Sequence, residues 1–392
     1  MRIHKLESNA GGKAGTARAA KKAARPSPVR PAPRRVTLGI IVGNRGFFPG
    51  HLASKGREEM LRAFREEGID AVIIDAAATN HGAIESRDEA KACAALFKKH
   101  REQIDGVVVT LPNFGDERAV ADTLRLAGLD VPVLVHATAD DPAKMLIDNR
   151  RDAFCGKMSC CNVLSQYGIK YSLTSQHTQR PESPGFRRDL REFAATCRVV
   201  RGLRGARIGA IGARPAAFKT VRYSEKLLEA SGISVEPIDL SEILGRIARL
   251  KDRDASVLRK LDEMLAYVDT AGVPEPALVK MAKLGLVMER WMKEVDVTVS
   301  AVQCWTSMEE YFGVVPCTLM SMMSNANLPS ACEVDVAGTV AMYALQLASG
   351  RPSALAQKWA RRPGSADTKV MLRSDSTLPS CCARRVGAGG PG

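Results

Sequence analysis

Short apolar runs alternate with longer amphipathic stretches along residues 36–135, a pattern typical of strands alternating with helices. Each apolar run is almost free of polar side chains, as expected of strands buried on both faces. The stretches between them space their apolar residues for one face of a helix. This part of the chain therefore predicts a parallel sheet covered by helices on both faces. The expected strands are 36–42, 71–75, 105–110 and 131–135, and the clearest expected helices are 54–67 and 86–103.

The same alternation resumes after a connector at 150–197, in which 152–168 predicts a helix that crosses between domains. We therefore expect an α/β fold with two doubly wound parallel-sheet domains in tandem. The expected strands of the second unit are 207–212, 233–238 and 297–303, and its main helices are 241–250, 254–271, 275–294 and 331–348. The predicted boundaries are 1–35 for a basic tail, 36–165 for the N-terminal domain, 166–355 for the second domain and 356–392 for another tail.

The net charge of +14 comes from the two tails. Residues 1–35 carry ten Lys or Arg and one Glu, and residues 356–392 carry seven Lys or Arg and two Asp. The remaining core, with 40 basic and 40 acidic residues, is neutral, which argues against nucleic-acid binding through a folded surface. Both tails lack periodicity, so we expect them to be disordered.

The cysteines and the apolar runs favour a cytoplasmic protein. The ten cysteines are scattered and form no Cys-x-x-Cys pair. This usage is typical of a reducing compartment. No apolar run approaches the roughly 20 residues that span a bilayer, so we expect no membrane partner.

Two loops at the predicted carboxyl ends of strands carry unusual residues. Residues 43–51 read Gly-Asn-Arg-Gly-Phe-Phe-Pro-Gly-His, and residues 111–116 include Asn113. Ligands of open parallel sheets bind at this edge, which favours a ligand-facing role for both loops. The alternative is that Phe47 and Phe48 only cover the edge of the sheet.

Residues 303–350 hold most of the acidic candidates. Ser307–Glu310 and Ser330–Glu333 both match the capping box of a helix N-terminus, with the Glu bonding back to the cap. The alternative for Glu333 is a carboxylate that binds a hard divalent cation. From the residues alone, both interpretations of Glu333 stay open.

Seven motifs together resemble the L-fucose/L-arabinose isomerase family over residues 36–355. They are Gly43-Asn-Arg-Gly-Phe-Phe-Pro, Leu111-Pro-Asn-Phe-Gly, Gly156-Lys-Met-Ser-Cys-Cys-Asn, Gly209-Ala-Ile-Gly-Ala-Arg-Pro-Ala-Ala-Phe, Arg222-Tyr-Ser-Glu-Lys, Gln303-Cys-Trp-Thr-Ser-Met-Glu-Glu-Tyr and Ala331-Cys-Glu-Val-Asp. The resemblance implies two α/β domains followed by a barrel-like third domain. It also implies aldose–ketose isomerisation through an enediol with a divalent metal, usually Mn²⁺, and a homo-oligomer that acts on a small sugar.

Four residues take roles from this resemblance. Glu333 matches the first of two acids that ligate the metal and move the proton, so it is the expected catalytic residue and metal ligand. Gln303 matches a glutamine that binds the substrate. Arg45 and Asn113 lie in loops that face the sugar.

The chain departs from the family pattern after Gly350. Where the second acid is expected, the chain has Gln357-Lys358-Trp359, and no histidine follows His177. The third domain is therefore expected to be largely absent, and we hypothesise that residues 356–392 are an out-of-frame translation. The expected function is a metal-dependent isomerase with impaired activity. The alternative is a two-domain module that binds a sugar without catalysis.

Overall fold

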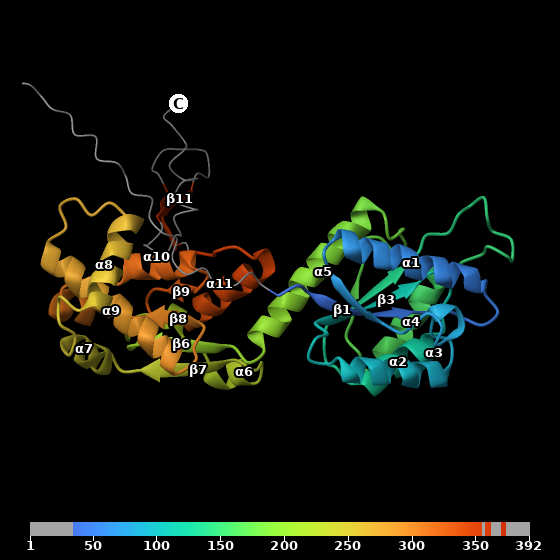
Figure 1. Ribbon diagram of the computed structural model, residues 1–392, viewed down its shortest axis with the longest axis horizontal. Helices are drawn as coiled ribbons and strands as arrows, with labels where there is room; N and C mark the ends of the chain where they lie inside the picture. The colour runs from blue at the N-terminus through green and yellow to red at the C-terminus, as the bar shows by residue number, and fades with distance from the viewer. Residues whose placement is uncertain (1–33, 355–356, 362–369, 374–392) are drawn as a thin grey trace, which may run out of the picture.

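A computed structural model describes residues 34–354 together with 357–361 and 370–373. Figure 1 shows two lobes side by side, each built on a parallel sheet, with helix α5 (Pro184–Leu203) running between them. The predicted fold class, two parallel-sheet α/β units in tandem, is confirmed.

The first lobe has a five-stranded parallel sheet with the order β2-β1-β3-β4-β5. Helices α1 and α5 cover one face, where Phe64, Phe186 and Leu190 are buried. Helices α2, α3 and α4 cover the other face around Phe97 and Leu111. The elements before α5 are β1 (Thr37–Val42), α1 (Gly50–Glu66), β2 (Asp70–Ile73), η1 (Asn80–Gly82), α2 (Arg87–Lys99), β3 (Gly106–Leu111), α3 (Glu117–Ala127), β4 (Val133–Ala137), α4 (Ala153–Gln166) and β5 (Ser172–Leu173).

The second lobe has a four-stranded parallel sheet with the order β7-β6-β8-β9. Helices α7 to α10 enclose a core around Met288 and Trp291 on one face. Helices α6 and α11 cover the other face, with Tyr343 at the margin. The elements are β6 (Arg207–Ile211), η2 (Lys219–Val221), α6 (Glu225–Glu229), β7 (Ser234–Ile238), α7 (Leu240–Ala248), α8 (Ala255–Tyr267), α9 (Glu275–Glu294), β8 (Val299–Val302), η3 (Ser307–Phe312), α10 (Cys317–Asn325), β9 (Ser330–Ala331) and α11 (Val336–Ser349).

The first unit ends later than the predicted boundary at 165/166. Helix α4 does not cross between the lobes, because its residues Cys160 and Leu164 are buried against the first sheet. Strand β5 also pairs with β4 of that sheet. The crossing helix is α5, whose Arg198 donates to the carbonyl oxygens of Leu347 (2.9 Å) and Ala348 (2.7 Å) at the end of α11. Since α5 packs on both lobes, the change of unit falls at its carboxyl end.

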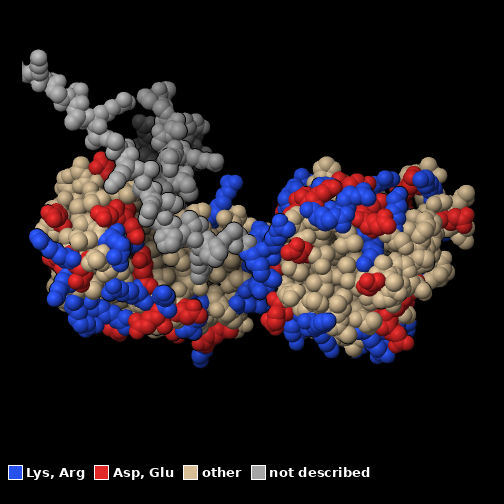
Figure 2. Space-filling model, in the orientation of Figure 1, with Lys and Arg blue, Asp and Glu red and all other residues tan. Residues whose placement is uncertain are grey.

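The expected tails lie mostly outside the described residues. Within 356–392, the structure describes β10 (Gln357–Arg361) and β11 (Val370–Arg373), which pair antiparallel where the sequence predicts disorder. Over the described core, Figure 2 shows acidic and basic side chains interspersed on the visible face of both lobes. At the seam between the lobes, Arg34 and Arg201 both bind Asp105, at 2.7 and 2.5 Å. None of the helices described is long and apolar enough to cross a membrane.

Candidate functional site

Asn113 lies buried at the carboxyl end of β3, where it ties two loops of the first lobe together. Its Nδ2 donates to Oδ1 of Asn44 at 2.6 Å, and its Oδ1 accepts from the Gly115 N–H at 3.2 Å. Asn44 in turn donates to Glu85 at 2.5 Å. Its Nδ2 also contacts the Pro49 carbonyl at 3.4 Å, so the amide of Asn113 holds the loops in place.

Arg45 follows β1 in the same region and is also engaged. Its Nε donates to the Gly115 carbonyl at 3.0 Å, and its guanidinium forms an ion pair with Glu117. The guanidinium also stacks over the Phe114 ring, 4.2 Å from its centroid. Of the adjacent aromatics, Phe48 packs on Phe114, whereas Phe47 is 77% exposed.

Gln303 follows β8 in the second lobe, and its side chain has a fixed orientation. Its Oε1 accepts a hydrogen bond from the Ala213 N–H at 2.9 Å, while its Nε2 makes only a long contact of 3.4 Å with the Trp305 carbonyl. This approach requires a glycine at position 212, where φ is +86° and a Cβ would lie 2.4 Å from Gln303 Oε1. The bond to Ala213 leaves the amide donors of Gln303 as the groups suited to contact a ligand.

Glu333 lies in a left-handed turn between β9 and α11. It is 9% exposed, and both Glu333 (φ +63°) and Val334 (φ +54°) adopt a conformation that non-glycine residues avoid. Two such residues in succession cost on the order of 2 kcal/mol or more, and strain of this kind concentrates at functional sites. The Val334 N–H bonds to the Val302 carbonyl at 3.2 Å, so the turn is attached to the end of β8.

Both predicted capping boxes are wrong. Helix α11 begins at Val336, and Asp335 caps it by accepting from the Gly338 N–H at 2.7 Å. Ser330 instead lies buried in β9, with its Oγ 2.9 Å from the Oγ of Ser300 on the neighbouring strand. Strand β9 (Ser330–Ala331) occupies the start of the segment that the sequence assigns to the helix. The residue that caps the helix therefore lies five positions later than predicted.

The other box fails at η3, a π-helical turn. Thr306 precedes it with no side-chain cap, so Ser307 is not the capping residue. The N–H of Glu310 bonds to the Thr306 carbonyl, and the side chains of Glu309 and Glu310 are exposed.

The structure brings the predicted residues together in two pairs, not as four. Arg45 and Asn113 lie at the carboxyl edge of the first sheet, and Gln303 and Glu333 lie at the carboxyl edge of the second. In Figure 1, β1 runs outward from the seam between the lobes, and the β7 arrow points outward in the other direction. Because the strands within each sheet are parallel, the two carboxyl edges face opposite ends of the molecule.

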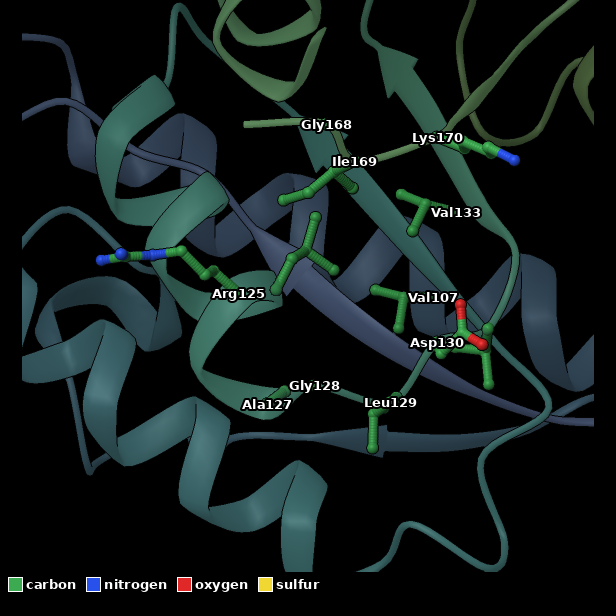
Figure 3. A pocket seen from close by; sticks show the side chains of 12 residues that line it. Val107, Arg125, Ala127, Gly128, Leu129, Asp130, Val133, Gly168, Ile169 and Lys170 are labelled. Carbon is green, nitrogen blue, oxygen red and sulfur yellow. The ribbon is translucent and has the colours of Figure 1, made fainter. Parts of the chain in front are cut away.

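A separate cavity of about 310 Å³ lies at the amino ends of β3 and β4, away from both pairs. Figure 3 shows its apolar wall, which includes Val107, Val133 and Ile169. The charged ends of Arg125 and Lys170 point away from it. Without polar groups that converge on it, the cavity offers no arrangement for catalysis.

A buried polar network lies beside β4, and no motif pointed to it. His136 is fully buried, with Nδ1 3.0 Å from Thr110 Oγ1 and Nε2 2.8 Å from the Gln179 carbonyl. Burial lowers the pKa of His136 to about 4. Nearby, Lys157 donates to Thr174 (2.7 Å) and to the His177 carbonyl, and burial lowers its pKa to about 8. These contacts hold residues 174–179 against the sheet.

The described residues do not complete a metal site. Over 34–354 and the two C-terminal strands, no group of three His, Cys, Asp or Glu is placed to hold a metal ion. Glu333 offers one hard oxygen ligand, fewer than a protein-held divalent cation requires. A metal-dependent step therefore cannot be derived from these residues alone.

The comparisons with known proteins concern mainly the first lobe. Residues 39–204 match the family model described as "Fucose/sulfoquinovose isomerase, N-terminal domain". The match ends at the carboxyl end of α5, where the structure also changes from the first unit to the second. The first lobe thus resembles the N-terminal domain of the fucose/sulfoquinovose isomerase family, and the resemblance predicted from the motifs is confirmed at that level.

Among curated relatives, the chain is similar to sulfoquinovose isomerases. It is 20% identical over 202 residues to the one from Priestia aryabhattai, which covers 51% of this chain and 44% of that protein. It is 24% identical over 203 residues to the one from Alkalicoccus urumqiensis, with the same two coverages. It is 23% identical over 176 residues to the one from Clostridium sp. (strain MSTE9), which covers 44% of this chain and 39% of that protein. The chain thus matches less than half the length of each of these relatives.

One solved structure aligns over more of the chain but with little similarity. It is a protein from Mycobacterium smegmatis in complex with beta-D-fucofuranose, aligned over 81% of this chain and 88% of that one. The identity is 12% and the TM-score is 0.19, so the alignment carries no argument about the fold or the ligand.

Proposed function

We propose that this protein is an aldose–ketose isomerase of the fucose/sulfoquinovose isomerase family, acting on a small sugar. The observation that carries the proposal is the strained, buried turn of Glu333 beside Gln303 at the carboxyl edge of the second sheet. The resemblance of the first lobe to that family supports it. A sugar related to fucose, arabinose or sulfoquinovose is the proposed substrate.

Glu333 is the proposed catalytic base. Isomerisation of an aldose moves a proton from C2 to C1 while the C2 hydroxyl becomes a carbonyl and the C1 carbonyl becomes a hydroxyl. A carboxylate can take the C2 proton and return it to C1 of the enediol. Holding Glu333 in a left-handed turn fixes the direction of its side chain, which this transfer requires.

Gln303 is the proposed substrate-binding residue. Because its Oε1 is held by Ala213, its Nε2 hydrogens are free to donate to a sugar oxygen once the long contact to Trp305 is exchanged. An amide donor beside the base orients a hydroxyl or carbonyl oxygen without competing for the proton.

We propose Mn²⁺ or another divalent metal as the cofactor, with Glu333 as the ligand from this chain. The ion would polarise the oxygens on C1 and C2. The other ligands are not among the described residues, so we expect the chain by itself to turn sugar over slowly.

We further propose a cytoplasmic homo-oligomer. Arg45 and Asn113 lie at the opposite end of the folded molecule from Glu333. They can therefore face the same sugar as Glu333 only where two copies of the protein meet. The first lobe exposes Phe47 (77%) in the loop between β1 and α1 and Leu146 (80%) in the loop between β4 and α4. Exposed apolar side chains of this kind are typical of protein interfaces. The cytoplasmic assignment rests on the eight described cysteines, which are thiols and not disulfides.

A sugar-binding module without catalysis is the second candidate. It is favoured because the described residues hold no group of three His, Cys, Asp or Glu that could bind a metal ion. Calorimetry with L-fucose, L-arabinose and sulfoquinovose, with and without Mn²⁺, separates the two. The isomerase proposal predicts sugar binding that Mn²⁺ strengthens and that Glu333→Gln returns to the metal-free value. Binding that is indifferent to both changes supports the module instead.

A further inference from the structure

Three cysteine side chains meet beside the turn that carries Glu333. Cys304 follows Gln303 after β8, Cys332 directly precedes Glu333, and Cys317 is the first residue of α10. The Sγ atoms of Cys304 and Cys332 are 2.9 Å apart. Cys332 also forms a thiol hydrogen bond with Cys317, and these two contacts raise its pKa.

The ends of two neighbouring strands bring Cys304 and Cys332 together. Strands β8 and β9 are parallel neighbours, with Ser300 opposite Ser330 and Ala301 opposite Ala331. Continued by one residue, this register places Cys332 opposite Val302, so Cys304 lies diagonally across from it, two residues beyond the end of β8. The two thiols nevertheless meet, with their Sγ atoms 2.9 Å apart. A disulfide sulfur pair is about 2.0 Å apart, so the two thiols would have to approach by roughly 0.9 Å.

Solvent access divides the three thiols into two buried ones and one accessible one. Cys304 and Cys332 are each 6% exposed, whereas Cys317 is half-buried. Cys317 also stands in the first turn of a helix of nine residues, a position that favours a thiolate. An oxidant in solution would therefore meet Cys317 first.

We propose that Cys304 and Cys332 are a site of reversible disulfide formation, with Cys317 relaying oxidation from small-molecule disulfides in solution. The bond would join the strand end that carries Gln303 to the turn that carries Glu333. This inference concerns the chemistry of the thiols and does not depend on the isomerase proposal.

The relay balances as thiol–disulfide exchange. The Cys317 sulfur attacks a small-molecule disulfide, forms a mixed disulfide and releases one thiol. Cys332 then attacks the Cys317 sulfur and releases the second small thiol. Finally, Cys304 attacks the Cys332 sulfur and returns Cys317 to a thiol. In total, two protein thiols lose two electrons and two protons, and the small disulfide is reduced to two thiols.

Peptide mapping of the intact protein after treatment with oxidised glutathione tests the proposal. Free thiols are alkylated, and digestion with Glu-C and chymotrypsin cleaves after Glu310 and Leu319, which separates the three cysteines into different peptides. We expect a Cys304–Cys332 linked peptide that dithiothreitol removes. Cys93→Ala, which removes a buried thiol from the core of the first lobe, should leave the linked peptide unchanged.

Two results would overturn the proposal. One is a map of the wild-type protein with glutathione adducts and no link between Cys304 and Cys332. The other is a link that always includes Cys317, which would assign the pair differently. Cys317→Ala should slow formation of the linked peptide at least about tenfold without abolishing it, and an unchanged rate would refute the relay. The peptide map of the wild-type protein shows which two cysteines are linked, even if the Cys317→Ala variant folds poorly.

Discussion

The backbone N–H of Val334 donates to the carbonyl oxygen of Val302 at 3.2 Å, which attaches the turn of Glu333 to the strand end that precedes Gln303. The hydrogen bond continues the pairing of β9 with β8 for one more step beyond the strand. The turn is therefore held in a left-handed conformation by its neighbours, although neither Glu nor Val favours it.

Strain in this turn should be measurable as a higher stability with glycine than with alanine at position 333, the reverse of the usual order. Glu333→Gly should be more stable than Glu333→Ala by about 1 kcal/mol, because a Cβ is unfavourable at φ +63°. Both variants remove the carboxylate, so their comparison isolates the backbone. Urea unfolding of the two proteins measures the difference, and an alanine variant equal to or more stable than glycine would show that the turn is relaxed.

The positions of the strands could be read from the sequence, but the conformation at their ends could not. Apolar runs located β1, β3 and β8 to within two residues, because buried parallel strands have few polar side chains. Ser330–Glu333 matches a capping box by its residue types, yet Asp335 caps the helix because β9 extends through Ser330. The pairing of β9 with β8 determines which residue caps the helix, and the spacing of residues in the motif does not reveal this pairing.

Contacts between distant residues were also beyond the sequence. Cys304 and Cys332 are 28 residues apart, and His136 bonds to the carbonyl of Gln179, 43 residues away. Cys304 and Cys332 lie beyond the paired residues of β8 and β9, and Gln179 lies beyond those of β5, where the chain folds back on the ends of the sheets. Gln303 and Glu333, by contrast, are candidates because each matches a family motif, and Gln303 also ends a predicted strand.

The fit of Gln303 against Gly212 predicts a steric effect of substitution. Gly212→Ala should destabilise the protein by about 2–3 kcal/mol, since a Cβ would lie 2.4 Å from Gln303 Oε1 in addition to the cost of φ +86°. Gly205→Ala is the matched control, because φ is +76° there and no atom lies within 4 Å of the Cβ. It should cost about 1 kcal/mol. Equal losses in chemical denaturation would mean that Gln303 moves aside freely.

The Asn113–Asn44 bond predicts a loss of stability in the first lobe. Asn113→Ala should cost about 2 kcal/mol, because it leaves buried polar groups of Asn44 and Gly115 without their partner. Asn80→Ala removes an exposed amide that bonds to Glu85 and should cost less than about 0.5 kcal/mol. Thermal or urea unfolding compares them. A cost for Asn113→Ala as small as that for Asn80→Ala would argue that water replaces the lost contacts.

Because His136 is buried, we expect the stability of the protein to fall as the pH is lowered. Burial lowers its pKa from 6.5 to about 4, so its contribution is complete above pH 6.5 and is lost as the pH falls toward 4. At 1.36 kcal/mol per pKa unit, the loss is about 3 kcal/mol. His136→Gln, which cannot titrate, should have lower stability at pH 7 but a shallower decline between pH 6.5 and 4. Parallel declines in the two proteins would show that His136 does not contribute.

Exchange of solvent deuterium into the sugar tests the central claim, that Glu333 is a catalytic base, most directly. The intact chain is incubated in D₂O with Mn²⁺ and L-fucose, L-arabinose or sulfoquinovose, and deuterium on the sugar is followed by NMR. Exchange requires only proton abstraction and return, so it reports slow catalysts well. We expect measurable exchange into at least one sugar, a decrease of at least about 100-fold in Glu333→Gln, and no change in Glu309→Gln, an exposed acid of the same lobe. Exchange at the same rate in the wild type and Glu333→Gln, or none into any of the three sugars, would contradict this claim.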